Sequence, residues 1–178
     1  MRKKLGERIE HRLERGDKVA NCRFCEIYKS HKNIVLETDH FYMWFDEFPL
    51  TPGHAEMVAK RHVASLLELK RTEWVDLQNA IQEGIDRIEK TNLRTLYKNL
   101  AKKPRNKKSK RFYELMLKHI GLGEKPDGYN FGVNEGEAAG RTVEHLHMHI
   151  IPRYFGDVRD PTGGVRNIFP PNIANYKK

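Results

Sequence analysis

Long hydrophobic segments and cysteine are both scarce in this chain of 178 residues. No apolar run approaches the ~20 residues that a membrane-spanning helix needs, and the N-terminal segment lacks the apolar stretch of a signal peptide. We therefore expect no association with a membrane and a cytoplasmic location. Cysteine occurs twice, as Cys22 and Cys25 in the sequence CRFC. In a reducing compartment this spacing indicates metal binding or redox chemistry rather than a structural disulfide.

Negative charge is in the minority, with 24 acidic residues against 33 lysines and arginines and a net charge of +9. A basic protein favours anionic partners such as nucleotides, nucleic acid or acidic membranes. Much of the positive charge lies in residues 98–118, KNLAKKPRNKKSKRFYELMLK. A charged run of this kind also serves simply as a solvated surface, so the sequence leaves both interpretations open.

The hydrophobic patterns predict strands as well as helices. Residues 7–17 predict a short helix within an N-terminal extension over residues 1–20. Residues 41–60 predict a strand, a loop and a second strand, because prolines and a glycine interrupt a run of aromatic and apolar residues. The mixture of hairpin-like strands and separate helices predicts an α+β fold with an antiparallel sheet.

Two helices are expected in the middle of the chain. The first covers residues 65–90, with Ser65 and Glu68 resembling a capping box. Its apolar residues recur at helical spacing and are expected to pack in the core: Trp74, Leu77, Ile81, Ile85 and Ile88. The second covers residues 110–123 and lies within a basic helical insertion at about 96–125. Residues 21–178 are expected to form one domain around this insertion.

Three histidines stand at alternate positions in the sequence EHLHMHIIPRY, as His145, His147 and His149. In a strand, alternate side chains point to the same face, so the three imidazoles are expected to project together. Leu146, Met148 and Ile150 then face the core. Three histidines on one face are suited to hold one metal ion, or to act as a nucleophile with supporting neighbours.

Several segments together resemble the histidine triad (HIT) family of nucleotidyl hydrolases and transferases. NCRFCEI is similar to the family's CxFCxI, and WFDEFPLTPGHAEMVAKRH is similar to F-x-D-x-x-P-x-x-x-GH-x-L-x-x-P-K-x-H. GVNEGEAAGRTVEHLHMHIIPRY follows N-x-G-x-x-A-G-Q-x-V-x-H-φ-H-φ-H, where φ is apolar. GDVRDPTGGVR resembles the tail of bacterial and archaeal members described as diadenosine polyphosphate hydrolase-like. The resemblance implies a HIT-like fold, an antiparallel sheet of about five strands with flanking helices.

The resemblance also implies catalytic roles. His147 is expected to attack an α-phosphate and form a covalent nucleotidyl-imidazole, which is consistent with the nucleophilicity of neutral imidazole. His149 is expected to bond a phosphate oxygen, and His54 occupies the position of a further histidine near the active site. Asn134, Gly140 and Thr142 are expected to contact the α-phosphate.

Further positions match those that hold the rest of the nucleotide. Asp46 corresponds to the acidic residue that accepts hydrogen bonds from ribose, although an aspartate before a turn is more often part of the turn itself. Phe24, Ile27 and Trp44 fall where the family lines its base pocket. Without the resemblance all three would be expected in the core, and for Ile27 that alternative stays open. Arg141 departs from the family's usual glutamine and is expected to add positive charge near the phosphates.

By the same resemblance, Cys22, Cys25, His62 and His145 form one metal site. Two thiolates and two imidazoles make a closed tetrahedral site for a structural Zn²⁺, one per chain. A redox CxxC is the alternative, but no thioredoxin-like βαβ pattern surrounds it.

The leading functional hypothesis is therefore an enzyme that cleaves dinucleoside polyphosphates or AMP conjugates, with adenine nucleotides as substrates. The alternative is a nucleic-acid-binding protein that removes adenylate from DNA or RNA ends, for which the basic insertion, with Phe112 and Tyr113, supplies charge and stacking groups. A homodimer is expected by resemblance.

Overall fold

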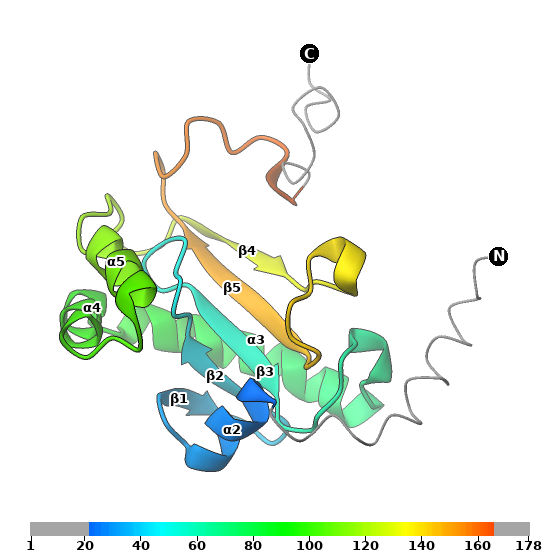
Figure 1. The fold of residues 1–178 in the computed structure, drawn as a ribbon. Coiled ribbons are helices and arrows are strands. Elements are labelled where there is room, and N and C mark those ends of the chain that lie inside the picture. Colours follow the sequence, from blue (N-terminus) through cyan, green and yellow to red (C-terminus); the bar gives the residue numbers. More distant parts are fainter. Residues whose placement is uncertain (1–21, 166–178) are drawn as a thin grey trace.

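The computed structural model describes residues 22–165, and the helix expected over residues 1–20 lies outside them. Five antiparallel strands form one sheet in the order β1-β2-β3-β5-β4. The strands are β1 (Ile34–Glu37), β2 (Phe41–Phe45), β3 (Ala55–Ala59), β4 (Gly128–Gly132) and β5 (His147–Arg153). The sheet and the helices around it confirm the α+β prediction (Figure 1).

The histidine strand β5 lies between β3 and β4, so its backbone is hydrogen-bonded to a neighbouring strand on each side. Ile150 is fully buried and Met148 packs against the main core, together with Leu146 just before the strand. Because side chains alternate, His147 and His149 project from the opposite face. The predicted division of this segment into a core face and a histidine face is confirmed.

One long helix, α3 (Arg71–Lys90), covers the core face of the sheet and runs behind it in Figure 1. The helix approaches the strands closely at Gly84, where a Cβ atom would lie 3.1 Å from Sδ of Met43 and 3.2 Å from Cε of Met57. A larger residue there would force both methionine side chains to move. Gly84 therefore lets a helix backbone lie directly on the sheet.

Two expectations for this helix are wrong. The helix begins at Arg71 rather than at residue 65, because Ser65 instead accepts a hydrogen bond from Leu67 N and starts a short 3-10 turn, η1 (Leu66–Glu68). Trp74 is 46% exposed and does not belong to the core. The buried positions of α3 are Glu73, Leu77, Ala80, Gly84 and Ile88.

A short helix, α2 (Arg23–Ser30), covers part of the other face of the sheet. Phe24 and Cys25 from this helix pack with Tyr42, Trp44 and Val58 in a second, smaller core. The Tyr42 hydroxyl donates a hydrogen bond to the Phe24 carbonyl oxygen over 2.7 Å. The helix is thus fixed beside the row of histidines.

The basic segment forms two helices, α4 (Leu93–Lys102) and α5 (Lys107–Met116), which lie side by side at one end of the sheet (Figure 1). The second helix begins at Lys107 and ends before the glycines expected to stop it. Its start is capped by Asn106, whose side chain accepts from Ser109 N at 2.8 Å. Among residues 22–165, no helix is both long enough and apolar enough to cross a membrane.

Candidate active site and metal centre

Four potential metal ligands converge from three segments of the chain. Cys22 and Cys25 lie at the start of α2, His62 follows β3, and His145 precedes β5. The Nδ1 atom of His145 lies 3.2 Å from Sγ of Cys22 and 3.6 Å from Sγ of Cys25, and Nδ1 of His62 lies 3.3 Å from Sγ of Cys25. All four ligand atoms lie within 4.8 Å of one another.

These residues fit a tetrahedral metal ion. Typical zinc–sulfur and zinc–nitrogen bonds in tetrahedral geometry place the sulfur and nitrogen ligands about 3.6 Å apart, close to the observed distances. His145 is fully buried, and its Nε2 lies 2.6 Å from the Ala59 carbonyl oxygen. The Nε2–H donates this bond, so the Nδ1 lone pair faces the two thiols, as is usual for a metal-binding histidine. Both cysteines are free thiols.

His147 lies next to this cluster, and the backbone of His145 orients its side chain. Its Nδ1 lies 2.8 Å from the carbonyl oxygen of His145, which accepts a hydrogen bond from Nδ1–H. This bond assigns the tautomer, so the lone pair of neutral His147 is on Nε2. Burial lowers the pKa of His147, so the imidazole is uncharged near neutral pH. The residue therefore has the tautomer and charge state of a nucleophile.

A chain of hydrogen bonds assigns the tautomer of His149 as well. The backbone N–H of Leu50 donates to Nδ1 of His54 at 3.2 Å, so neutral His54 carries its proton on Nε2. That Nε2 lies 3.1 Å from Nδ1 of His149. His149 then bears its own proton on Nε2 and can donate it to a phosphate oxygen. Burial lowers the pKa of His54 to about 4, which keeps this chain uncharged.

Two carboxyl groups lie beside the histidines. The Oδ1 of Asp46 accepts a hydrogen bond from Phe48 N at 2.7 Å. The structure therefore confirms that Asp46 stabilises the turn. Its Oδ2 lies 3.6 Å from Nε2 of His54 and 3.9 Å from Nδ1 of His149, and its carboxylate also has a side-chain hydrogen bond with Glu56. Asp46 therefore both shapes the turn and faces the histidine site.

Glu56 is the second carboxyl group, and the sequence interpretation did not include it. It is 8% exposed, its Oε2 accepts a hydrogen bond from Trp44 Nε1 at 2.7 Å, and its Oε1 lies 3.8 Å from Nδ1 of His149. Burial and the charge of Asp46 raise its pKa to about 8. The signal was present, because Glu56 has the same strand parity as His54 and stands where the HIT pattern quoted above has leucine.

Of the aromatic residues expected in the base pocket, Phe24 lies next to His147. The ring of Phe24 is 4.9 Å from that of His147 and makes an edge contact with Trp44 at 6.3 Å. Both aromatic residues are buried, and Ile27 packs against the same small core. The three residues lie in a small core that borders the histidines, and a role in binding the base stays a prediction.

The glycine-containing turn before β5 lies between β4 and the histidines. Gly140 has a positive φ of 88°, a conformation that favours glycine. Asn134 Nδ2 lies 3.5 Å from its carbonyl oxygen, and Thr142 is exposed. Asn134 and Gly140 therefore lie together in this turn, and the contact of all three residues with the α-phosphate stays a prediction.

Arg141 differs from its expected role. Its guanidinium is buried in the turn, where Nη1 donates to the Ala64 carbonyl oxygen at 2.7 Å and Nη2 lies 3.1 Å from the carboxylate of Glu144. Glu135 lies 3.9 Å from the same guanidinium. The side chain therefore ties two loops together, and only its charge, which lowers the pKa of His147, acts on the site.

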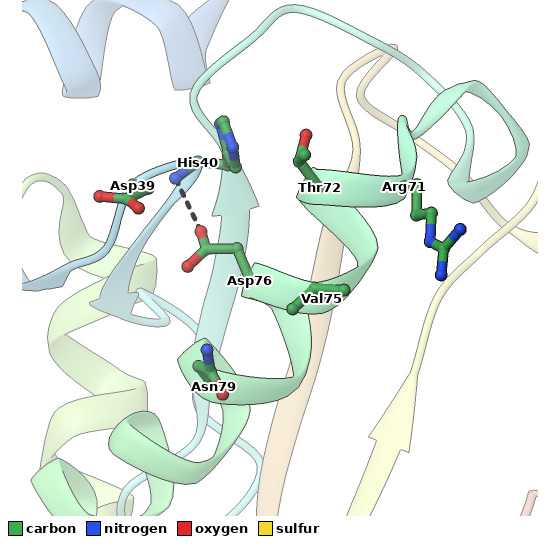
Figure 2. A pocket seen from close by; sticks show the side chains of 7 residues that line it. All are labelled: Asp39, His40, Arg71, Thr72, Val75, Asp76 and Asn79. Carbon is green, nitrogen blue, oxygen red and sulfur yellow. Dashed lines mark hydrogen bonds between the residues drawn. The ribbon is translucent and has the colours of Figure 1, made fainter.

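A separate shallow pocket lies away from His54, His147 and His149, between the β1–β2 turn and α3 (Figure 2). Asp76 accepts hydrogen bonds there from His40 N at 2.7 Å and from the Thr38 hydroxyl at 2.8 Å. These contacts secure the turn, so the main polar group of this pocket has a structural role.

The family model for the HIT domain matches residues 28–156, which include the three histidines of the 145–149 segment, His54 and His62. The chain belongs to the HIT family. Cys22 and Cys25 precede the matched range, and helix α2 joins them to it.

Curated HIT relatives include proteins of several activities. A HIT-like protein of Methanocaldococcus jannaschii is 28% identical over 138 residues, which are 76% of this chain and 81% of the relative. An AP-4-A phosphorylase of Mycobacterium tuberculosis is 29% identical over 70% of this chain and 48% of its own length. An adenosine 5'-monophosphoramidase of Saccharomyces cerevisiae is 27% identical over 89% of this chain and 76% of its own length.

The solved structure of a HIT family member from Bacillus subtilis superposes with a TM-score of 0.54 and 23% identity. The match covers 86% of this chain and 89% of that protein. It supports the same fold, including the five-stranded antiparallel sheet predicted from the sequence.

Proposed function

We propose that this HIT protein cleaves dinucleoside polyphosphates or AMP conjugates at the α-phosphate, with adenine nucleotides as substrates. The observation that carries the proposal is the hydrogen bond from Nδ1–H of His147 to the carbonyl oxygen of His145. It leaves an unprotonated Nε2 on a buried, neutral imidazole, and such an atom is nucleophilic near pH 7.

In the proposed first step, Nε2 of His147 forms a bond to the α-phosphorus and the bond from phosphorus to the leaving phosphate oxygen breaks. A phosphate leaving group departs as an anion. With an AMP–amine conjugate the P–N bond breaks instead, and the amine takes up a proton from water. In both cases the nucleotidyl-imidazole carries a positive charge. Water then attacks the same phosphorus, the bond to Nε2 breaks, and a nucleoside monophosphate and a proton are released. Each of these two displacements has a lower activation barrier than the single direct attack of water on the α-phosphate.

The neighbouring groups form no covalent bond to the substrate and are proposed to stabilise its charge through hydrogen bonds. His149, through the Nε2–H assigned by its contact with His54, donates a hydrogen bond to a non-bridging phosphate oxygen. Asn134, Gly140 and Thr142 are proposed to contact the same phosphate from the turn. Asp46 is proposed to accept hydrogen bonds from the ribose.

Phe24, Ile27 and Trp44 are proposed to border the base of the nucleotide. The names of two relatives, AP-4-A phosphorylase and adenosine 5'-monophosphoramidase, support adenine nucleotides as the substrate class. They also suggest two leaving groups, a nucleotide and an amine.

We propose that Cys22, Cys25, His62 and His145 hold a structural Zn²⁺. Zinc bound there would take no part in the chemical steps and would fix α2 and the His145 backbone rigidly in place. Since the His145 carbonyl orients His147, the metal supports the nucleophile indirectly. The homodimer inferred from the resemblance stays a prediction, as does a cytoplasmic location.

A turnover panel tests the proposal. Purified protein is incubated with diadenosine tetraphosphate, ADP and an adenosine phosphoramidate, with and without inorganic phosphate, and the products are identified by chromatography. Release of AMP and ATP from the tetraphosphate supports hydrolysis at the α-phosphate. Formation of ADP that requires inorganic phosphate makes phosphate the acceptor, and reaction of the phosphoramidate alone restricts the leaving group to an amine.

The His147→Ala variant is the control for this panel. It is expected to lose at least about 1,000-fold in turnover on the best substrate while keeping its unfolding temperature. Unchanged turnover in this variant would contradict the proposal.

A further inference from the structure

The positive charge of the protein is concentrated in one structural unit, the α4–α5 hairpin, here defined as residues 93–118. This unit contains ten lysines and arginines and a single acidic residue, Glu114, so its net charge is +9. The rest of the chain has 23 basic and 23 acidic residues and is therefore neutral. All ten basic side chains of the hairpin are exposed.

The hairpin is a packed element that displays these charges on its outer surface. Its apolar side is buried through Leu93, Tyr97, Tyr113 and Met116, and the rings of Tyr97 and Tyr113 stack at 6.2 Å. An ordinary solvated helix surface mixes both signs of charge, as α3 does. A ratio of ten to one on an ordered surface instead indicates an anionic partner.

The hairpin is fixed to the loop that carries Asp46 and His54 (residues 46–54). Arg105 pairs with Glu47 at 3.2 Å, and Phe112 contacts Phe48 with ring centroids 5.5 Å apart. The hydroxyl of Tyr97 accepts a hydrogen bond from Gly53 N at 2.9 Å. The charged surface therefore borders the loop of the histidine site.

The extent of the charge distinguishes among anionic partners. Each helix has ten residues and is about 15 Å long, a length over which duplex DNA carries about nine phosphate charges. The phosphate chain of a free dinucleotide is shorter and needs only a few cations. Among the hairpin residues Leu115 is the only large hydrophobic side chain that is exposed, which leaves little apolar surface to enter a membrane.

The mode of binding also follows from the packing. Phe112 and Tyr113, considered above as stacking groups for bases, are occupied by Phe48 and by the core, respectively. The hairpin then offers charge without free aromatic rings, which is suited to contacts with backbone phosphates and not to reading of bases.

We propose that the α4–α5 hairpin binds the phosphate backbone of nucleic acid, without sequence preference, and holds it beside the histidine site. This interaction goes beyond the proposed nucleotide cleavage and does not depend on it.

Fluorescence anisotropy of a labelled 20-base-pair DNA duplex of mixed sequence tests the proposal, with the full chain titrated at 50 to 200 mM KCl. The variant Lys102→Gln, Lys103→Gln, Lys107→Gln, Lys110→Gln removes four charges and leaves the anchoring Arg105 unchanged. Its affinity at 100 mM KCl is expected to fall at least tenfold. The slope of log affinity against log salt concentration should become shallower by up to about 3.6, since each lost phosphate contact contributes about 0.9.

A matched control removes the same charge elsewhere, at the exposed Lys32, Lys70, Lys90 and Lys125, each changed to glutamine. Its affinity is expected to fall less than threefold. Equal losses in the two variants would show a non-specific effect of net charge and overturn the proposal. So would absence of duplex binding at 50 mM KCl, or binding to phosphatidylserine vesicles in place of the duplex.

The His147→Ala variant separates this inference from the proposed function. It is expected to bind the duplex as the wild type does, because His147 is not part of the hairpin. An inactive wild-type enzyme that binds the duplex would leave the inference standing and refute only the proposed reaction.

Discussion

Nδ1 of His147 lies 2.8 Å from the backbone carbonyl oxygen of His145, whose own side chain belongs to the cysteine-histidine cluster. One residue thus contributes its imidazole to the candidate metal site and its backbone carbonyl to the orientation of His147, the proposed nucleophile. His145 precedes β5 and His147 begins it, and the backbone carbonyl of the first fixes the tautomer of the second.

Loss of the proposed zinc is therefore expected to lower activity, because the zinc would hold the His145 carbonyl that orients His147. Cys25→Ser should reduce the zinc content from about one per chain to near zero and lower the unfolding temperature by roughly 10 °C or more. Zinc is measured by atomic emission and unfolding by calorimetry. His31→Ala, at an exposed position at the end of α2, is the control and should retain the zinc. Full zinc content in the Cys25 variant would contradict the assignment of the ligands.

His54 is expected to act through His149 as a positioning residue. His54→Ala removes the group that faces Nδ1 of His149, so the proton of His149 is no longer directed to Nε2. We expect kcat to fall about tenfold with little change in KM, because the missing contact matters most when charge develops in the transition state. His54→Gln, whose amide can donate to His149, should recover part of the loss.

The control for this experiment is His40→Ala, which changes a histidine whose contact with Asp76 runs through its backbone N–H. It should leave kcat unchanged. A similar loss in both variants, or an unchanged rate in His54→Ala, would show that His54 does not orient His149.

Glu56 is expected to make stability depend on pH. Burial and the charge of Asp46 raise the pKa of Glu56 from 4.5 to about 8, so the folded protein holds a proton that the unfolded chain releases. The contribution of the protonated group is complete below pH 4.5 and is lost as the pH rises toward 8. Glu56→Gln keeps a neutral acceptor for Trp44 Nε1 and removes this dependence.

The unfolding temperature of the Glu56→Gln variant should equal that of the wild type at pH 4.5 and exceed it by about 5 °C at pH 8. Glu83→Gln, at an exposed position of α3, is the control and should show no such trend. A difference between Glu56→Gln and the wild type that does not grow with pH would contradict the protonated state of Glu56.

The sheet and most of the site followed from local patterns in the sequence. Alternation between histidines and apolar residues placed Ile150 in the core and His147 on the other face, because a strand has a strict period of two. The resemblance located the four candidate metal ligands in three short motifs, and these do converge. Such features depend on spacing along the chain, which the sequence contains directly.

The failures concern contacts between distant segments. Trp74 has the correct helical spacing for the core, but Gly84 allows α3 to lie so close to the sheet that the helix buries a neighbouring stripe. The hydrogen bond from the Arg141 guanidinium to the Ala64 carbonyl oxygen was likewise not foreseen, because only the fold brings these two loops together. Propensity and motif cannot specify which loop will pack against a given side chain.

The most direct test of the account is detection of a nucleotidyl group on His147. His149→Ala is mixed with diadenosine tetraphosphate, quenched within one turnover and examined by intact and peptide mass spectrometry. The account predicts one adenylyl group, bound to His147 and absent from a His147→Ala variant. Turnover without any adduct, or an adduct on another residue, would contradict it.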